Sequence, residues 1–179
     1  MFQIPSTVPS GLTHLQTAEK AKSYAWRHDH KKALMLYREA MHQAQTEEAE
    51  PIFLRHYTEC ILESLEAMEQ YQDILSYCEQ ALEHYHSHPP ESDLARCDLA
   101  SIYERRAINA AKVGDTLLAS EACDKACELA ASIQQQLPVA EKLKQWLKSG
   151  LHISVSRISS EQKRTGYFSV RNHQMGVNA

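Results

Sequence analysis

Three glutamates near the middle of the chain share one face of a predicted helix. Glu59, Glu63 and Glu66 are spaced i, i+4 and i+7, which places them on one side of an α-helix. The other side of the same stretch is apolar and carries Ile61, Leu62, Leu65 and Met68. A row of carboxylates attracts basic or amphipathic ligands. A solvated helix surface has the same pattern, so both interpretations stay open.

Three histidines form the run His84, His86 and His88, and two of them stand at i and i+4. Histidines at this spacing on a helix chelate metals. The run lies at a predicted helix end, however, where histidines also hydrogen-bond free carbonyls and complement the helix dipole. No cysteine or carboxylate is spaced in sequence to complete a closed site. We therefore predict no metal site.

Five cysteines occur in the chain, and none belongs to a C-x-x-C motif. They are interpreted as reduced, mostly buried small hydrophobes. Cys123 and Cys127 are an i, i+4 pair on one helix, a spacing that does not favour a disulfide.

No motif of a known catalytic site is present. The chain lacks G-x-S-x-G, a glycine-rich phosphate-binding loop, H-E-x-x-H and the dinucleotide-binding fingerprint. We predict a protein that is not an enzyme and needs no cofactor.

Composition favours an all-α fold, because helix formers such as Ala, Leu, Glu, Gln and Lys are abundant and there are only five glycines and six prolines. The N-terminal stretch lacks the charged and apolar regions of a secretion signal, and no apolar run is long enough to cross a membrane. A cytoplasmic protein without a membrane partner is expected.

Charge is unevenly distributed along the chain. Residues 1–138 carry 12 basic and 21 acidic side chains, whereas residues 139–179 carry seven basic and two acidic ones. The acidic body offers no basic face to nucleic acid, so a nucleic-acid partner is not expected.

The stretch from Ser101 to Ala131 contains two amphipathic helical segments separated by a turn at residues 112–115. Gly114 is suited to ending the first helix, and Asp115 to capping the second. Small residues recur where the two helices would cross closely: Ala107, Ala110 and Ala111, then Ala119, Ala122 and Ala126.

This helix–turn–helix resembles a tetratricopeptide repeat. Tyr103, Ala107, Gly114, Ala119 and Ala126 match the fourth, eighth, fifteenth, twentieth and twenty-seventh positions of that pattern. Two earlier copies align on Ala33 and Ile74, at intervals of 41 and 45 residues up to Ala119. These intervals resemble the long-repeat variant found in kinesin light chains and in sensor domains of bacterial regulators.

The resemblance implies an all-α, right-handed α–α superhelix of about three helix pairs, followed by a C-terminal capping helix over Val139–Leu151. The expected organisation is an irregular lead-in over residues 1–12, the helical repeat domain over 13–151, and a basic, flexible tail over 152–179. An ordinary helical bundle with alanines at chance positions is the structural alternative.

The family's groove positions, carried onto this sequence, predict a partner-binding site. It comprises Lys22, Trp26, His56, Glu59, Glu63, Glu66, Glu104, Ile108 and Lys112. The resemblance implies a non-catalytic protein-interaction module, an adaptor or scaffold, that binds a peptide or helix of a partner protein in an acidic concave groove. The lysine and asparagine set with which some members hold acidic C-terminal peptides is missing, so a basic or amphipathic ligand is expected.

The chain contains one such ligand itself. Arg157, Lys163, Arg164 and Arg171 flank Tyr167 and Phe168, so the tail could fold back on the groove and compete with a partner; a tail that only adds solubility is the alternative. Two other functional classes stay open: a secretion-type chaperone for an unstable client, and a regulatory sensor that binds a small molecule or signalling peptide.

Overall fold

The computed structural model describes residues 12–170, and this part of the chain contains eight helices and no strand. The predicted all-α class is therefore confirmed. The helices are α1 (His14–Trp26), α2 (His30–Thr46), α3 (Pro51–Ala67), α4 (Tyr71–Ser87), α5 (Asp93–Lys112), α6 (Thr116–Ser132), α7 (Pro138–Lys148) and α8 (Val155–Thr165).

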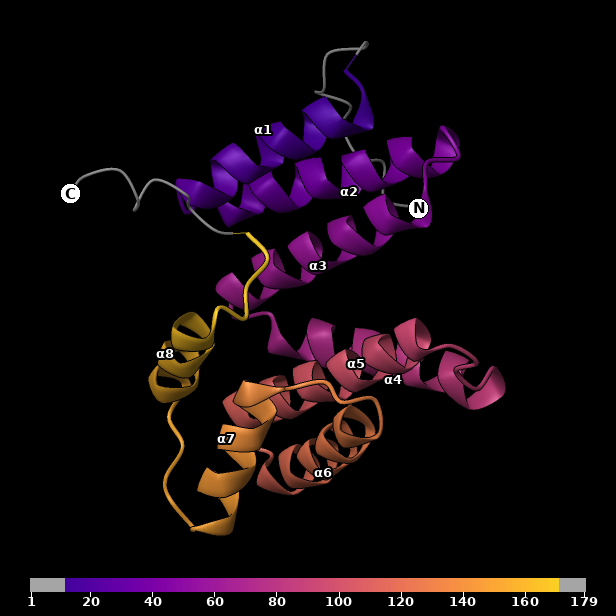
Figure 1. Cartoon of the computed structure of the whole chain (residues 1–179). Coiled ribbons are helices and arrows are strands. Elements are labelled where there is room, and N and C mark those ends of the chain that lie inside the picture. The colour runs from indigo at the N-terminus through magenta and orange to yellow at the C-terminus, as the bar shows by residue number, and fades with distance from the viewer. Residues whose placement is uncertain (1–11, 171–179) are drawn as a thin grey trace, which may run out of the picture. The chain divides into compact units, whose positions relative to one another are not determined.

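The chain divides into two compact units, and the division falls between α3 and α4. Of the described residues, unit 1 contains 12–68 together with Ser169 and Val170, and unit 2 contains 69–168. In unit 1, α1, α2 and α3 lie side by side in chain order (Figure 1). In unit 2, α5 is the central helix and packs against α4, α6, α7 and α8.

Turns of one backbone conformation recur along the chain at the predicted spacing. His28, Glu69 and Gly114 all adopt the left-handed conformation, with φ of 61°, 60° and 86°, and stand at the predicted intervals of 41 and 45 residues. The helix after each of these turns, α2, α4 or α6, is 17 residues long in every case. Of the three predicted helix pairs, α1 packs against α2 and α5 packs against α6, whereas α3 and α4 belong to different units.

The same turn is built from different residues in the different copies. Asp29 and Asp115 cap the following helices, because their carboxylates accept the backbone N–H groups of Lys32 and Leu118 at 3.3 and 3.0 Å. Of the three turn residues, Gly114 alone is a glycine and adopts the left-handed conformation without steric cost. At the equivalent position, His28 carries a Cβ in that conformation, which costs about 1 kcal/mol.

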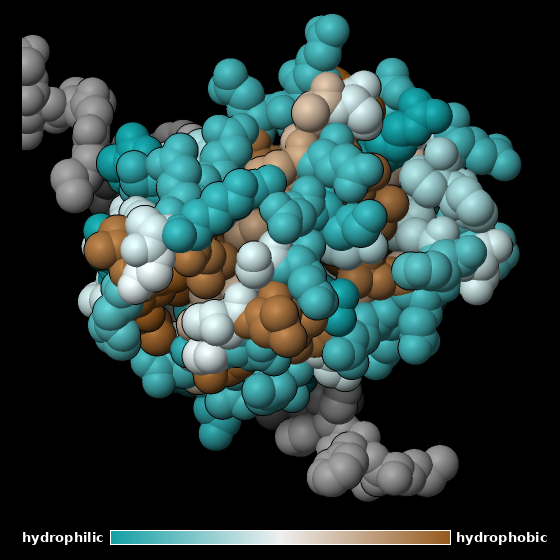
Figure 2. All heavy atoms as spheres, turned by 90° about the horizontal axis from the view of Figure 1, so that it is seen from below, coloured by the Kyte–Doolittle hydropathy of each residue, from teal (hydrophilic) through white to brown (hydrophobic). Residues whose placement is uncertain are grey.

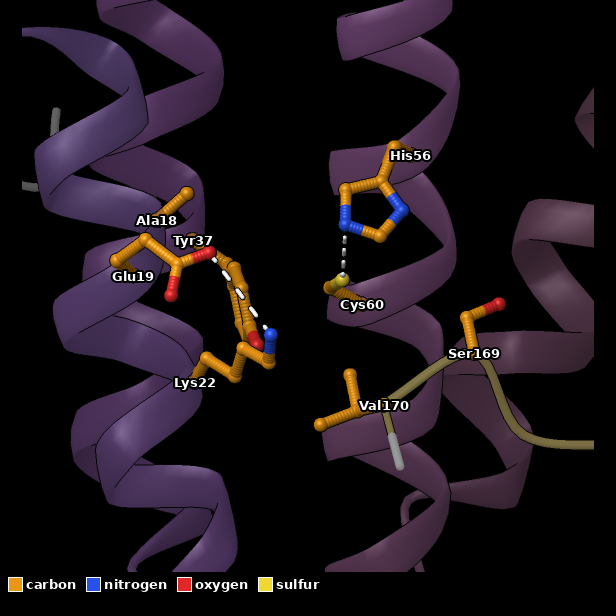
Figure 3. A pocket seen from close by; sticks show the side chains of 8 residues that line it. All are labelled: Ala18, Glu19, Lys22, Tyr37, His56, Cys60, Ser169 and Val170. Atoms are coloured by element: carbon orange, nitrogen blue, oxygen red, sulfur yellow. Dashed lines mark hydrogen bonds and ion pairs between the residues drawn. The ribbon is translucent and has the colours of Figure 1, made fainter. Parts of the chain in front are cut away.

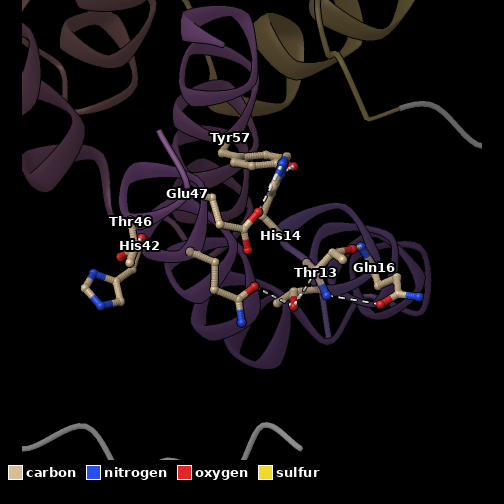
Figure 4. Close-up of polar contacts among 9 residues, drawn as sticks. Thr13, His14, Gln16, His42, Thr46, Glu47 and Tyr57 are labelled. Atoms are coloured by element: carbon tan, nitrogen blue, oxygen red, sulfur yellow. Dashed lines mark hydrogen bonds and ion pairs between the residues drawn. The ribbon is translucent and has the colours of Figure 1, made fainter. Parts of the chain in front are cut away.

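A polar cluster ties α1 to its two neighbours in unit 1 (Figure 4). The buried His14 imidazole lies with Nδ1 at 2.8 Å from the Tyr57 hydroxyl of α3 and Nε2 at 3.8 Å from a Glu47 carboxylate oxygen beyond the end of α2. The Thr17 hydroxyl donates to the Gln43 side-chain carbonyl of α2 at 2.8 Å. These contacts fix the N-terminal half of α1 against both helices.

In the core of unit 2, mostly small residues of α5 and α6 pack against larger residues of α7. The cluster contains Ala107, Ile108, Ala110 and Ala111 of α5, Ala119, Ala122 and Cys123 of α6, and Val139, Leu143 and Trp146 of α7. Helix α7 thus covers the last helix pair, and it occupies the stretch predicted for the capping helix.

The prediction of a flexible tail over residues 152–179 needs correction for residues 155–170. Helix α8 forms there; it begins at the N-cap Ser154 and ends at Gly166, whose φ is 68°. Ile158 is fully buried in the core of unit 2, and Gln162 is buried with it. The remainder of the predicted tail, 171–179, lies outside the described residues, as do residues 1–11 of the predicted lead-in.

The face shown in Figure 2 is mainly hydrophilic, with apolar side chains in separate groups between the polar ones. Within residues 12–170, no helix has the length and apolar character needed to cross a membrane.

We expect reciprocal effects of substitutions at two equivalent turns. His28→Gly should raise the free energy of unfolding by about 1 kcal/mol, because glycine relieves the left-handed strain, and Gly114→Ala should lower it by a similar amount. Space is not the cause at Gly114, because an added Cβ would meet no atom within 4 Å. Urea unfolding followed by tryptophan fluorescence measures the change in the free energy of unfolding for both variants. His28→Ala keeps the strain and should match the wild type; equal stabilisation by His28→Ala would contradict the explanation.

Candidate functional site

A small pocket of about 70 Å³ lies in unit 1 between α1 and α3 (Figure 3). Its lining comes from α1 (Ala18, Glu19 and Lys22), α2 (Tyr37), α3 (His56 and Cys60) and the returning C-terminal segment (Ser169 and Val170). In Figure 3, Glu19 and Lys22 extend from α1, and His56 and Cys60 face them from α3. The lining therefore combines charged groups at the sides with an aromatic ring and a thiol.

The cysteine and histidine of this pocket do not form an activated nucleophile. The Cys60 sulfur lies 3.6 Å from Nε2 of His56. Burial, however, raises the pKa of the Cys60 thiol to about 12, and the Glu63 carboxylate acts in the same direction. Burial likewise raises the pKa of the Tyr37 hydroxyl. Because the thiolate is the nucleophilic form, burial disfavours nucleophilic attack by Cys60 at neutral pH.

The returning segment Ser169–Val170 is held by one carboxylate of α3. Glu63 accepts the backbone N–H of Ser169 on one oxygen and that of Val170 on the other, the latter at 3.0 Å. The Val170 side chain packs against the apolar cluster of unit 1, which consists of Ala21, Ala25, Ala33, Tyr37 and Cys60. Unit 1 thus holds a bent piece of main chain at Ser169 by two consecutive N–H groups and by one aliphatic side chain.

The charge of the pocket is mixed rather than purely acidic. Lys22 Nζ lies 3.9 Å from a Glu19 carboxylate oxygen and 5.0 Å from the centre of the Trp26 ring. The predicted groove residue Trp26 therefore lies next to the predicted groove residue Lys22, one turn further along α1. The lining of the pocket therefore carries one cation and one carboxylate, both on α1.

In unit 2, the predicted groove residues of α5 are engaged by the protein itself. The buried Glu104 carboxylate accepts the backbone N–H of Ala140 at 3.0 Å and so caps the first turn of α7, whose own N-cap residue Leu137 offers no side-chain acceptor. Ile108 is fully buried in the core. Lys112 Nζ donates to Gln162 of α8 at 2.9 Å and lies 5.5 Å from the centre of the Tyr71 ring.

The placement of Glu104 and Ile108 corrects their predicted role. Both were expected to face a partner, and Ile108 to anchor it. Helices α7 and α8 instead pack on α5, and these side chains serve the packing of unit 2.

The structure brings together Lys22, His56 and Glu63 around one pocket and segment, all predicted as groove residues. On α3, Glu59 is half-buried and Glu66 is buried, so this helix face is not a simple solvated surface. The sequence analysis did not include four residues of the site: Tyr37, Cys60, Ser169 and Val170. The first two lie in the predicted repeat pattern as packing positions, whereas the last two lie beyond it.

The histidine run lies at the end of α4, as predicted. The rings of His84 and His88 stack with centroids 4.8 Å apart, and His86 Nδ1 lies 3.0 Å from the Leu82 carbonyl oxygen one turn earlier. Across residues 12–170, no group of three or more His, Cys, Asp or Glu side chains is arranged to hold a metal ion.

Comparisons of this chain with protein-family models, with curated proteins and with solved structures find no match. The resemblance to tetratricopeptide repeats therefore stays a prediction. The function has to be argued from the geometry of the two units.

The capping carboxylate predicts how the stability of unit 2 depends on pH. Burial raises the pKa of Glu104 from 4.5 to about 7, despite the opposing hydrogen bond from Ala140. Between these two values the folded state binds more protons than the unfolded state, so stability falls as the pH rises through 7. Glu104→Gln keeps an acceptor for Ala140 and removes the charge. We expect the free energy of unfolding of this variant to be higher than that of the wild type by up to about 3 kcal/mol at pH 8, and to equal it near pH 4.5.

Urea unfolding followed by Trp146 fluorescence, in a Trp26→Phe background, measures this effect in unit 2. Glu121→Gln replaces an exposed glutamate of α6 that does not act on the pKa of Glu104, and it should leave the pH dependence unchanged. A Glu104→Gln effect of the same size at pH 4.5 and pH 8 would contradict the assignment.

Proposed function

We propose that this chain is a non-catalytic protein-interaction module of the tetratricopeptide-like helical repeat type. The pocket between α1 and α3 of unit 1, with Glu63 beside it, holds a short segment of a partner protein. The module acts in the cytoplasm as an adaptor or scaffold.

One observation carries this proposal. The Glu63 carboxylate accepts the main-chain N–H groups of two consecutive residues, and the aliphatic side chain of the second, Val170, packs between α1 and α3. In peptide recognition, main-chain hydrogen bonds supply affinity, and a pocket for a side chain supplies specificity. Hydrogen bonds to a charged acceptor are also stronger than those to a neutral one. The site therefore supplies both affinity and a requirement for one type of side chain.

The chemistry of the pocket supports binding rather than catalysis. The Cys60 thiol is held protonated by burial. The Glu63 carboxylate is occupied as an acceptor of main-chain N–H groups. Glutamates on α3 and the cation–aromatic pair on α1 suit a partner segment of mixed, amphipathic character.

The test is a peptide selection on a background in which the internal segment is displaced. In the wild-type chain, a change at Glu63 weakens the internal segment and a partner alike, and the two effects cancel in the measured affinity. We therefore select peptides from a random displayed library on the full chain carrying Val170→Asp. Their affinities are then compared with those for Val170→Asp/Glu63→Gln by fluorescence anisotropy.

Glu63→Gln should weaken the selected peptides about tenfold or more, because it removes a charged acceptor of two N–H groups. The matched control is Glu79→Gln, which replaces an exposed glutamate of α4 in unit 2 and should change nothing. If no peptide is selected, or if the selected peptides bind both Glu63 forms equally well, the α1–α3 pocket is not the partner site.

A further inference from the structure

We propose, on the basis of the proposed function, a ligand class and an internal competitor for this site. The ligand is a peptide with a bent main chain that donates the N–H groups of two consecutive residues, the second of which is aliphatic and larger than valine. The chain's own Ser169–Val170 is a weaker ligand of the same class, and a partner must displace it.

The main-chain contacts exclude proline from both positions. Glu63 uses one carboxylate oxygen for the N–H of Ser169 and the other for that of Val170. Proline has no N–H, so at either position it would leave one buried carboxylate oxygen without its donor. Neither contact involves the Ser169 side chain, so the first position is defined only by its backbone.

The pocket is not filled by the valine. Figure 3 shows the Val170 side chain directed into the space between α1 and α3, below Cys60. About 70 Å³ remains open there, with Val170 itself as part of the lining. Atoms bordering such a space lack contacts that a longer side chain would supply. A leucine or methionine at this position therefore fits the site better than the valine of the chain itself.

The attachment of the internal segment explains how a weak ligand can still hold the site. The described contacts of Ser169–Val170 with unit 1 comprise two N–H groups and one aliphatic side chain. As part of the same chain, however, the segment acts at an effective concentration of about millimolar. A free peptide with a better side chain competes with it when its intrinsic affinity is higher. The internal segment thus occupies the site but can be displaced by a partner that binds more tightly.

Two full-length variants displace the internal segment in different ways. Val170→Asp puts a charge into the apolar contact, and Ser169→Pro removes one of the two N–H donors. Both residues lie outside the helices, so the helical fold is kept. Ser169→Ala keeps the donor and serves as the matched control. Circular dichroism melting verifies that all three fold.

The probes are fluorescein-labelled hexapeptides with the sequence of residues 165–170, ending in an amide. A first peptide keeps valine at the last position, a second has leucine there, and a third has proline. Binding to the wild type and to each variant is measured by fluorescence anisotropy.

We expect the leucine peptide to bind about fourfold more tightly than the valine peptide, as one added methylene predicts. The proline peptide should not bind. Val170→Asp and Ser169→Pro should each bind the leucine peptide at least about fivefold more tightly than the wild type does, and Ser169→Ala should behave as the wild type.

Three results would overturn the inference while leaving the proposed function intact. Equal affinity of the wild type, Val170→Asp and Ser169→Pro would show that the segment does not compete. No preference for leucine would show that the open space is not part of the site. A wild-type dimer that Val170→Asp dissociates, seen by sedimentation, would assign the segment to a second copy. Loss of Glu63 dependence among the library-selected peptides would instead refute the proposed function itself.

Discussion

Close approach of paired helices is the constraint on which the rest of the structure depends. Alanines Ala21, Ala33, Ala107 and Ala119 have no exposed surface, because the backbones of consecutive helices meet at these positions. A larger side chain there would force the pair apart. Since the small residues occupy one side of each helix, the longer side chains must lie on another. In unit 1 that other side borders the pocket between α1 and α3.

The two units use buried carboxylates in the same physical role. Glu104 accepts a backbone N–H at the start of α7, and Glu63 accepts two from the returning segment. In each case the donor belongs to a segment that follows the helix pairs in sequence. A buried carboxylate is costly unless it is hydrogen-bonded, so each glutamate favours the docking of a later segment on the helix that carries it.

The fold was predictable because its signals are local and periodic. Alanines at helical spacing and intervals of 41 and 45 residues located the pairs, and the residues expected in the turns, including His28 and Glu69, adopt the same backbone conformation as Gly114. Helix α8 gave no such signal. Its burial depends on Ile158 and on the polar Gln162, which pairs with Lys112, and a buried glutamine is invisible to a hydropathy pattern.

The site was predictable only in part. Lys22, His56 and Glu63 border the α1–α3 pocket, as the helix register of the repeat implies. Glu104 and Ile108 have the same register, but a capping helix predicted from sequence does not reveal which face of α5 it will cover. The return of the tail to the groove was a hypothesis from charge, but which tail residues make the contact was not predictable, because the contacts of Ser169 and Val170 with Glu63 span more than a hundred residues.

The discontinuity of unit 1 in the sequence has a consequence for the order in which the protein is made. The ribosome completes α1, α2 and α3 by Met68, yet Ser169 follows about a hundred residues later. At about 5–20 residues per second, several seconds separate the two events. During that interval the nascent helices present the α1–α3 surface before Ser169 and Val170 have been synthesised. Under the proposed function, a partner that meets the chain at this stage binds without competition from the internal segment.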